Sequence, residues 1–467
     1  MIPALTPEQT AEADSAAVEA AGDPSTFINR AGHAVAEAAL RMMGGAYGRR
    51  VTVIAGKGNN GNDGRVAAAT LTSWGASVRV VDALEAHDEF IDGRRAELVI
   101  DAAFGTGLRG GWSPPVVFDV PVLAVDIPSG LNARTGRVEG GVLVADRTVT
   151  FSALKVGMLL GDGPSVCGEI DVIDVGIPLR GVVEPGVFVV DAHDVRRWLP
   201  PRDRHAHKWS HALRVVAGSA GMTGAASLVT AAAMRAGAGI VHLSTRGEVS
   251  TAQFPTEVVH RSLPANSWVG EIARDSARFG ALVIGPGLGR GDDVALEVRE
   301  VLAGTDLPTV VDGDAIAESV DPRGGYGTLS ARTAPTVLTP HDGEFAALGG
   351  DVHADDAVLA TQELAERCGC TVLRKGPTTI VASPGMPAFL VVSGDERLAT
   401  AGSGDVLAGI IGAFLARGME AHEAAAAAAF VHGMAGSSLP VEGTIARDVV
   451  ALVSEVLVRI SEGTAGE

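Results

Sequence analysis

A short glycine-rich segment that ends in a carboxylate is the part of this sequence best placed to do chemistry. Gly402, Ser403 and Gly404 lead into Asp405, and an apolar run typical of a buried helix follows as far as Ala416. The first N–H groups of a helix lack partners within it, the helix dipole favours negative charge there, and glycines let an anion approach. We therefore predict that Asp405 takes a proton from a hydroxyl that is being phosphorylated. The alternative is a glycine turn with Asp405 as an ordinary helix cap.

A second candidate site lies in the first half, where an apolar strand runs into GKGNNGNDG at Gly56–Gly64. Its glycines match GxGxxG, and Asp82 ends the next strand, where a dinucleotide fold places its ribose-binding acid. Alone, this pattern suggests a nicotinamide dehydrogenase. Asn59, Asn60 and Asp63 are unusual in a pyrophosphate loop, however, and favour a polar ligand or a hard cation. The alternative is that they serve only a tight turn.

Two further strand ends carry similar side chains. Asp101 follows an apolar strand and precedes GTGLRGG, and Asp126 opens DIPSG, which contains Ser129. Ligands of open parallel sheets bind at the carboxyl ends of the strands, so these residues and Asn60 are expected to converge at one edge. Oxygen ligands without His or Cys indicate a hard cation. Lys155 follows another strand, but a lone lysine is more often a solvated charge.

The composition excludes several classes of protein. The chain has 467 residues, 46% of them apolar, and 60 glycines, which fits alanine-rich α/β layers in more than one domain. A net charge of −19 argues against nucleic-acid binding. The 3 cysteines show neither zinc-like spacing nor a disulfide framework. The sequence shows no signal peptide and no apolar run of membrane length, so we expect a cytoplasmic protein with no membrane partner.

The second half repeats the pattern of a strand followed by a polar or glycine-rich loop. No GxxxxGK[ST] motif occurs, which argues against a P-loop NTPase. Residues 177–201 mix Pro, Gly, Val and Asp without a helix or strand pattern, which predicts domains at 1–200 and 205–467. The basic segment that follows contains His205, His207 and His211, which suit a polar linker better than a metal site. The loops that follow strands in the second half, and that are expected to meet at one edge of its sheet, are GSAGMTGAAS (218–227), GPGLGRGD (285–292), DGDAI (312–316), TPHDGEFAAL (339–348) and KGPTT (375–379).

The order GNNGxDG, DxxFGTG, DIPSG and TFxALKxG resembles the NAD(P)H-hydrate epimerase family over about the first 180 residues. The resemblance implies a Rossmann-like three-layer α/β domain that interconverts the R and S forms of NADH or NADPH hydrated at C6. We expect Asp126 to be the catalytic carboxylate. Asn62 stands where the family usually has Gly, and Leu154 replaces the usual Pro. The resemblance implies potassium at Asn60, Asp101 and Ser129, and substrate contacts at Asn59, Asn60, Gly61, Asn62, Asp63, Gly105, Thr106, Gly107, Leu108, Arg109, Gly110, Gly111 and Asp126.

From about residue 205 onward, VVAGSAGMTGAA, AGAGIV, GPGLG, TPHDGE, KGPTT and GSGDVLAG resemble the ADP-dependent NAD(P)H-hydrate dehydratase family, which has a ribokinase-like α/β fold. Three positions depart from the family: Asp342 replaces Pro, Asp395-Glu396-Arg397 replaces Asn-Pro-Gly, and Ile316 replaces Asn. Magnesium is expected with the nucleotide. The resemblance implies substrate contacts at Gly287, His341, Asp342, Gly343, Glu344 and Asp405, and nucleotide contacts at Lys375, Gly376, Pro377, Thr378, Thr379, Asp395, Ala401, Gly402, Ser403 and Gly404.

Some of these positions also have plain structural explanations. Lys375 beside Gly376 could hold a nucleotide phosphate as a point charge or be a lysine of a surface turn. His341 and Glu344 could contact substrate, or they could be a solvated histidine and a capping glutamate.

The two resemblances together predict a two-step repair enzyme for hydrated NADH and NADPH. The first domain would equilibrate the R and S epimers, and the second would dehydrate the S epimer at the expense of ADP, or of ATP, which the sequence does not exclude. Two alternatives stay open: a ribokinase-like kinase of a small alcohol, and a non-catalytic nucleotide-binding scaffold. We also expect a homo-oligomer.

Overall fold

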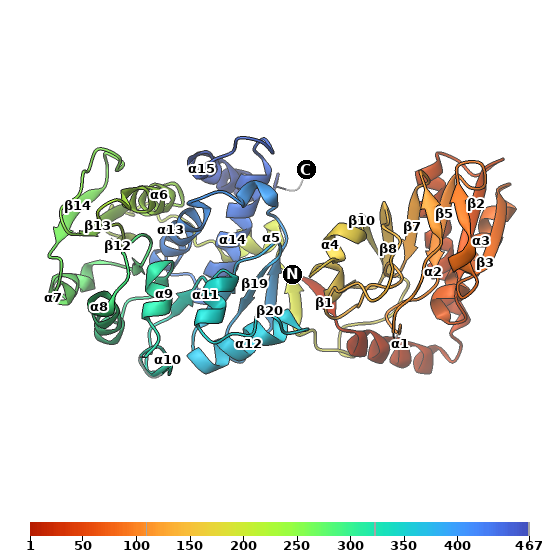
Figure 1. Ribbon diagram of the computed structural model, residues 1–467, viewed down its shortest axis with the longest axis horizontal. Helices are drawn as coiled ribbons and strands as arrows, with labels where there is room; N and C mark the ends of the chain where they lie inside the picture. Colours follow the sequence, from red (N-terminus) through yellow and green to blue (C-terminus); the bar gives the residue numbers. More distant parts are fainter. Residues whose placement is uncertain (109, 322–323, 466–467) are drawn as a thin grey trace. The chain divides into compact units, whose positions relative to one another are not determined.

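The chain folds into two compact units, which are described separately below. The computed structural model describes residues 1–108, 110–321 and 324–465. The first unit comprises residues 2–187, and the second begins at Phe188 (Figure 1). Among the described residues, no helix combines the length and the apolar character needed to cross a bilayer.

The first unit is built on a parallel sheet of six strands in the order β10-β8-β7-β5-β2-β3. Strand order and direction are those of an open α/β sheet, in which ligands bind at the carboxyl ends of the strands. The strands are β1 (Ile2–Leu5), β2 (Arg50–Ala55), β3 (Ser77–Asp82), β4 (Phe90–Asp92), β5 (Leu98–Ala102), β6 (Val116–Phe118), β7 (Val122–Val125), β8 (Arg147–Phe151), β9 (Leu154–Lys155) and β10 (Glu169–Ile173), and the α-helices are α1 (Pro7–Ala21), α2 (Ser25–Met43), α3 (Asn59–Ser73) and α4 (Gly163–Val166).

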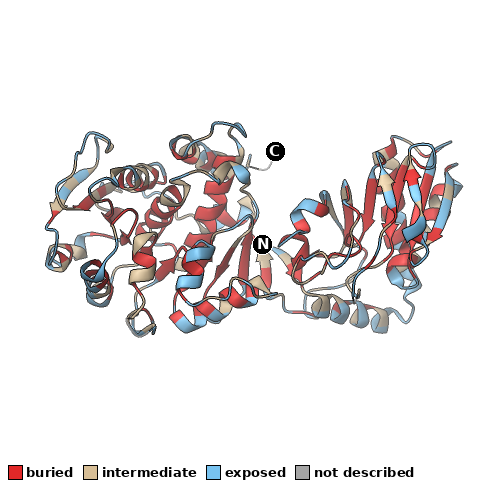
Figure 2. Cartoon of the chain, viewed as in Figure 1, coloured by how far each residue is buried: buried red, intermediate tan, exposed pale blue. Residues whose placement is uncertain are grey.

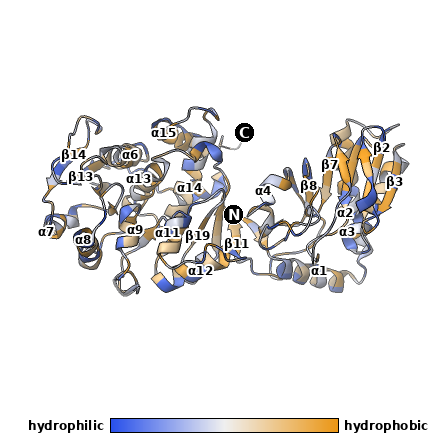
Figure 3. Ribbon diagram, viewed as in Figure 1, coloured by the Kyte–Doolittle hydropathy of each residue, from blue (hydrophilic) through white to orange (hydrophobic). Residues whose placement is uncertain are grey.

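Alternate residues of this sheet face different layers. Val53, Ile100 and Leu123 pack with α2 and α3 on one face, whereas Ile54 and Val99 pack on the other with the segment that contains β4 and β6. Figures 2 and 3 show the central strands as buried and apolar. This three-layer arrangement is the one expected for a parallel sheet with both faces covered.

Helix α1 begins at a capping box and ends at a left-handed glycine, both of which local sequence preferences favour. The Thr6 side chain accepts a hydrogen bond from the Gln9 N–H, the Gln9 side chain accepts one from the Thr6 N–H, and Gly22 ends the helix in the left-handed conformation. These contacts satisfy N–H and C=O groups that a helix terminus leaves unpaired.

The second unit has a sheet whose strands run in the order β14-β13-β12-β15-β16-β17-β18-β19-β20. Pairing is parallel from β14 to β18 and antiparallel from β18 to β20. The strands are β12 (Ala212–Val216), β13 (Ile240–Arg246), β14 (Val259–Leu263), β15 (Ala281–Ile284), β16 (Thr309–Val311), β17 (Thr336–Leu338), β18 (Thr371–Arg374), β19 (Thr379–Ala382) and β20 (Ala388–Val391), and β11 (Val187–Val189) lies at the boundary of the units.

Helices cover both faces of the second sheet. Helices α6, α13, α14 and α15 pack on the face that carries Val215 and Val283, and α8, α9, α11 and α12 pack on the face that carries Val216 and Ile284. The helices are α5 (Ala192–Trp198), α6 (Thr223–Arg235), α7 (Val269–Ala273), α8 (Asp292–Gly304), α9 (Asp314–Glu318), α10 (Gly327–Ser330), α11 (Asp342–Ala347), α12 (Ala357–Cys368), α13 (Ser403–Ala416), α14 (Ala421–Ser437) and α15 (Ala446–Glu462). The predicted α/β class is confirmed for both units.

Two predicted boundaries near the first site are wrong. Asn59–Gly64 is not a loop before a helix but the first turns of α3. A Cβ atom at Gly64 would lie 2.4 Å from the Ala102 side chain, so the absence of a side chain lets the helix pack directly on β5. Asp101 does not follow β5 but pairs within it, opposite Ile54 of β2. Tertiary packing overrides the turn preference of Asn and Asp at α3.

The close contact between α13 and α6 predicts a stability effect. A Cβ atom at Gly409 would lie 2.3 Å from the Val229 carbonyl oxygen, so Gly409→Ala must push the helices apart. We expect a loss of about 1–3 kcal/mol in the unfolding free energy of the second unit, measured by calorimetry. Gly304→Ala is the control, since nothing lies within 4 Å of its Cβ position. Equal effects of the two substitutions would contradict this packing.

Candidate active sites

The first unit has a cavity of about 590 Å³ at the carboxyl ends of its central strands. Three predicted segments meet there, namely the start of α3, the loop after β5 and the turn after β7. The predicted residues among its lining are Asn59, Asn60, Asp63, Gly105, Thr106, Gly107, Leu108, Asp126 and Lys155. Residues of α1 and α2, including Thr10, Asp14 and Phe27, complete the wall, and the sequence patterns did not assign them to a site.

Asp126 and Lys155 form a buried ion pair in this cavity. Lys155 Nζ lies 2.5 Å from Asp126 Oδ1 and 2.7 Å from Thr150 Oγ1, and the lysine side chain is 2% exposed. The sequence left Lys155 as a weak candidate, and the structure shows it paired rather than solvated. Asp126 has a φ of 66°, which is uncommon for a residue with a side chain and occurs most often at functional sites.

The residues expected to hold potassium come from three neighbouring strand ends, with Asn60 after β2, Asp101 at the end of β5 and Ser129 after β7. Asp101 Oδ1 accepts a hydrogen bond from Ser129 Oγ at 2.7 Å, and Asp101 Oδ2 accepts one from the Ser129 N–H at 2.9 Å. Burial raises the pKa of Asp101, although these hydrogen bonds oppose the shift. Asn60 is buried, and neither its side-chain oxygen nor its nitrogen has a partner. An unpartnered buried amide oxygen fits a cation ligand, because such a group is otherwise costly.

Two more carboxylates share the cavity with Asp126. Burial raises the pKa of Asp63 to about 8, and the nearby Asp126 and Asp14 add to the effect. The pKa of Asp14 is raised as well, by burial first and then by Asp126, while Lys155 opposes the shift. Asp63 is therefore protonated at neutral pH and can donate a hydrogen bond there.

Several predicted contacts of the first unit lie outside this cavity. Gly61 packs against the strand end, since a Cβ atom there would lie 1.9 Å from the Gly56 carbonyl oxygen. Gly111 lies beside Gly140 instead of the cavity. Asn62 and Gly110 do not line it either, and Arg109 lies outside the described residues.

In the second unit, α13 begins as the sequence predicts. Gly402 occupies the cap position in the left-handed conformation, and Asp405 lies in the first turn of the helix. The alternative in which Asp405 caps the helix is therefore wrong. Burial raises the pKa of Asp405 to about 7; Asp312 and Asp314 add to the shift and Lys375 opposes it. A carboxyl group with such a pKa suits a proton acceptor that works near neutral pH.

The turn before α13 differs in one respect from the predicted anion site. The Ser403 N–H donates to the Thr400 carbonyl oxygen at 3.3 Å, so this group is engaged within the turn. Ser403 Oγ donates to the Leu398 carbonyl oxygen at 2.8 Å and closes the same turn. Of the three predicted donors, the N–H groups of Gly402 and Gly404 therefore remain for an anion in this conformation.

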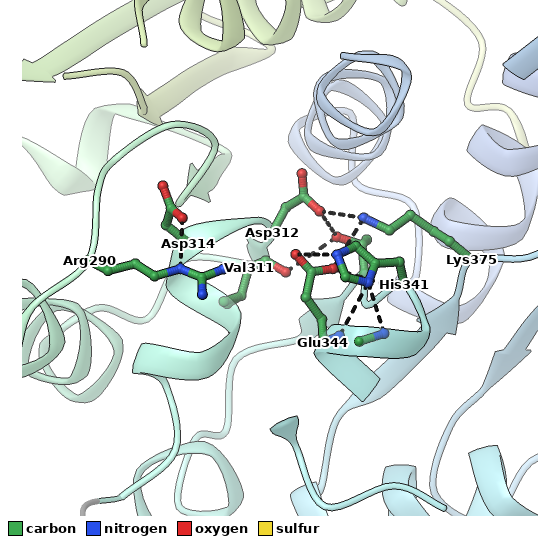
Figure 4. Close-up of polar contacts among 9 residues, drawn as sticks. Arg290, Val311, Asp312, Asp314, His341, Glu344 and Lys375 are labelled. Carbon is green, nitrogen blue, oxygen red and sulfur yellow. Dashed lines mark hydrogen bonds and ion pairs between the residues drawn. The ribbon is translucent and has the colours of Figure 1, made fainter. Parts of the chain in front are cut away.

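Lys375 contacts carboxylates after β16 and in α11 and also lies beside the start of α13. Its Nζ lies 3.1 Å from Asp312 Oδ1 and 3.6 Å from Glu344 Oε2 (Figure 4). The same atom would lie 3.4 Å from a Cβ atom at Gly404, which places the ammonium group beside the first turn of α13. Burial lowers the pKa of Lys375, but the carboxylates of Asp312 and Glu344 outweigh it, and the net pKa is raised. Lys375 is thus a charged, ion-paired residue and not a lysine of a surface turn.

His341 and Glu344 cap α11 reciprocally. His341 Nδ1 accepts hydrogen bonds from the N–H groups of Gly343 and Glu344 at 3.0 and 3.3 Å, and Glu344 Oε2 accepts one from the His341 N–H at 2.9 Å. The capping alternative is therefore correct for Glu344, which also contacts Lys375. His341 remains 61% exposed at its ring, so it is available to a ligand. Asp342 pairs with Arg374 at 2.8 Å.

The remaining predicted residues of the second unit form the surrounding turns. Gly287 has a φ of 60° and lies against Met222 and Ala225 of the loop and helix after β12. Gly376, Pro377 and Thr378 connect the antiparallel pair β18 and β19, and Thr379 begins β19. Asp395 accepts a hydrogen bond from the Arg397 N–H at 3.0 Å and pairs with its side chain. Ala401 lies in the turn before Gly402.

Helix α14 supports the turn before α13 from inside the protein. Ser393 Oγ donates to the Phe430 carbonyl oxygen at 3.1 Å, and Gly433 and Gly436 pack against the segment from Ser393 to Leu398. His432 contacts the Ser403 backbone, and burial lowers its pKa to about 4. The sequence patterns assigned α14 no role at the site, since buried packing residues carry no motif.

Asp312, Asp314 and Thr339 are site residues to which the sequence patterns assigned no role. Asp312 is 2% exposed and accepts a hydrogen bond from Thr339 Oγ1 at 2.6 Å. Asp314 pairs with Arg290 at 3.0 Å (Figure 4). Their positions directly after β16 and β17 were the available signal, because strand ends of a parallel sheet gather at one edge.

The pKa of Asp405 predicts a pH-dependent effect on stability. The pKa of Asp405 is about 7 in the folded protein and near the ordinary aspartate value of 3.8 in the unfolded chain, so wild-type stability falls as the pH rises between these values. Asp405→Asn removes this loss, so the variant gains stability over wild type from pH 4 to 7 and holds the gain above pH 8. Hydrogen exchange of residues 403–416 measures it. Glu455→Gln, on the exposed face of α15, is the control; a gain independent of pH would contradict the assignment.

Comparison with known proteins agrees with both units. A family model described as NAD(P)H-hydrate dehydratase matches residues 213–457, and one described as YjeF-related protein N-terminus matches residues 25–92 and 81–157. The solved structure of the ADP/ATP-dependent NAD(P)H-hydrate dehydratase from Bacillus subtilis, co-crystallized with ATP/Mg²⁺, is 28% identical with a TM-score of 0.51. The match covers 58% of this chain and 97% of that one.

Whole-length relatives combine both units in one chain. The bifunctional NAD(P)H-hydrate repair enzyme Nnr of Salinibacter ruber is 34% identical over 99% of this chain and 97% of its own. Those of Moorella thermoacetica and Mycobacterium tuberculosis are 34% and 38% identical over 88% and 82% of this chain, and over 87% and 82% of their own. These relatives support repair activity rather than a small-alcohol kinase, a scaffold or a dehydrogenase. The chain belongs to the family of bifunctional NAD(P)H-hydrate repair enzymes.

Proposed function

We propose that the first unit interconverts the R and S epimers of NADH or NADPH hydrated at C6, and that the second unit returns the S epimer to NADH or NADPH at the expense of ADP. Family membership supports the pair of activities. The observation that carries the proposal is the second site, where Asp405, with a pKa of about 7, lies at the start of α13 close to the Lys375 cluster. ATP as an alternative co-substrate, a homo-oligomer and a cytoplasmic location remain predictions.

Dehydration needs a better leaving group than hydroxide. Asp405 accepts the proton of the C6 hydroxyl while the hydroxyl oxygen attacks the terminal phosphoryl group of ADP, and this attack releases AMP. The ring nitrogen lone pair then expels phosphate, and loss of a C5 proton restores the dihydropyridine. The N–H groups of Gly402 and Gly404 stabilise the charge on the moving phosphoryl group; one such donor is typically worth about 3–4 kcal/mol. The ammonium group of Lys375, beside Gly404, supports the same charge.

Epimerisation needs a group that assists opening and reclosing at C6. Asp126 is positioned for this role, because Lys155 and Thr150 hold its Oδ1 while its backbone is fixed in an unusual conformation. Taking the hydroxyl proton turns C6 into an aldehyde while the C6–N1 bond breaks and its electron pair moves to N1. After rotation about the C5–C6 bond, N1 attacks the other face of the aldehyde and the proton returns to the oxygen, which gives the other epimer. The apolar part of the cavity wall, including Phe27, Ile28 and Val18, limits access of water.

Two metal ions accompany this proposal. Potassium would be held by Asn60, Asp101 and Ser129, as the unpartnered Asn60 amide supports, and would offset substrate phosphate charge. Magnesium would arrive with the nucleotide, since no cluster of His, Cys, Asp and Glu in the described part of the chain could hold a metal.

Variants of the two carboxylates separate the two activities. With mixed R and S hydrates of NADH and with ADP, we expect wild type to restore all of the NADH absorbance. Asp405→Asn loses the proton acceptor and slows recovery by about 10²–10⁴-fold. With Asp126→Asn, the S epimer is still converted to NADH at the wild-type rate, whereas the R epimer is converted only as fast as it epimerises spontaneously. A stable phosphate ester accumulating instead of NADH would contradict repair and indicate a kinase.

The rate of dehydration is expected to depend on pH through Asp405. Because this group must be deprotonated to accept a proton and has a pKa of about 7, kcat/KM rises with pH through about 7 and levels off above 8. Initial rates on the pure S hydrate measure the profile without contribution from the first unit. A profile that falls over this range would contradict the role of Asp405 as the base.

A further inference from the structure

Arg246 is a cationic side chain at the second site that takes no part in the proposed reaction. It is the last residue of β13, and its N–H donates to the carbonyl oxygen of Gly218, in the loop after β12, at 3.0 Å. Its side-chain Nη1 is excluded from solvent and has no hydrogen-bond partner. A buried guanidinium N–H without an acceptor is costly, and the cost disappears when a ligand supplies the acceptor.

The surroundings of Arg246 belong to the substrate side of this site. A Cβ atom at Gly289 would lie 3.6 Å from Arg246 Nη1 and 3.8 Å from Ser219 Oγ, so the missing side chain leaves space between the two groups. Ser219 Oγ donates to the Gly287 carbonyl oxygen at 3.0 Å. Gly287 is one of the predicted substrate contacts, and Arg246 therefore faces the loop that carries it.

Arg246 differs from the other cations around this site, because each of those has a carboxylate partner. In the described part of the chain, no carboxylate pairs with Arg246, although the protein carries a net charge of −19. The paired cations are Arg290 with Asp314, Arg374 with Asp342, Lys375 with Asp312, and Arg397 with Asp395. Of these five cations, only Arg246 thus has a charge that no carboxylate pairs with and that is available to an anionic ligand.

The position of β13 in the sheet indicates which ligand this is. In the strand order, β13 is five places from β18, and Lys375 and the predicted nucleotide loop directly follow β18. At about 4.8 Å between neighbouring strands, the two are about 24 Å apart. Helix α13 packs on the strands between them, so Asp405 lies in the middle of this edge. A phosphate near Arg246 belongs to the molecule that extends from Asp405 away from ADP.

We propose that Arg246 binds a phosphate group of the hydrated dinucleotide, through the forked N–H groups that suit phosphate oxygens. The inference rests on the proposed function of the second unit and adds a binding residue for its substrate. The phosphate is either in the pyrophosphate bridge, which both hydrates contain, or at the 2′ position, which only the NADPH hydrate contains.

The test compares Arg246→Gln with wild type on three S-hydrated substrates: those of NADH, of NADPH, and of dihydronicotinamide riboside, which carries no phosphate. We expect the KM to rise about 10- to 100-fold for both dinucleotides if the bridge is bound, and for the NADPH hydrate alone if the 2′-phosphate is bound. The KM for ADP and the kinetics on the riboside stay within twofold of wild type. Arg274→Gln removes an exposed arginine of the same unit and is the matched control.

Unchanged KM values for both dinucleotides, or a rise in the KM for ADP instead, would overturn the inference. Wild type that restores no NADH absorbance would refute the proposed function itself, which is a different result. If Arg246→Gln does not fold, Arg246→Lys keeps the charge and loses the fork, so its KM for a dinucleotide hydrate rises severalfold while its kinetics on the riboside do not change. Equal KM values for Arg246→Lys and wild type on both dinucleotides would overturn the inference as well.

Discussion

The second site depends on a partly buried lysine that lies between two carboxylates. Lys375 is held by Asp312 from the loop after β16 and by Glu344 from the helix after β17, and it reaches the first turn of α13. The Asp312 carboxylate is almost fully buried, and a buried charge is tolerated only when it is paired, so the cluster holds these segments in one arrangement. The same cluster, together with burial, sets the pKa of Asp405 near the pH at which a proton acceptor must work.

The first unit uses the same constraint with different residues. Lys155 is almost fully buried, and Asp126 and Thr150 satisfy its ammonium group at the carboxyl ends of β7 and β8. Removing one partner of such a pair leaves an uncompensated charge, which typically costs about 3–5 kcal/mol. Substitutions at Lys155 or Lys375 are therefore expected to lower both activity and stability, whereas Asp405→Asn is expected to lower activity and raise stability.

Small residues make these buried clusters possible. Gly402 allows the left-handed turn that exposes the start of α13, and the missing side chains of Gly433 and Gly436 let α14 pack closely under the preceding segment. An all-round apolar α13 gives the site a rigid base, since residues 406–416 are all buried. Rigid support matters because hydrogen-bond donors aimed at a transition state must not reorganise during the reaction.

The sequence by itself determined the α/β class, the strands that end in polar loops, the caps of α1 and the start of α13, because these features follow from local periodicity and from glycine and capping preferences. It could not show that Asn59 already lies in a helix or that Asp101 lies inside a strand, since packing of Gly64 and the pairing of β5 decide both. Only the tertiary structure brought Asp14 to the Asp126 cavity and paired Lys375 with Asp312. The physical reason is that pairing and burial, unlike propensity, depend on residues far apart in the chain.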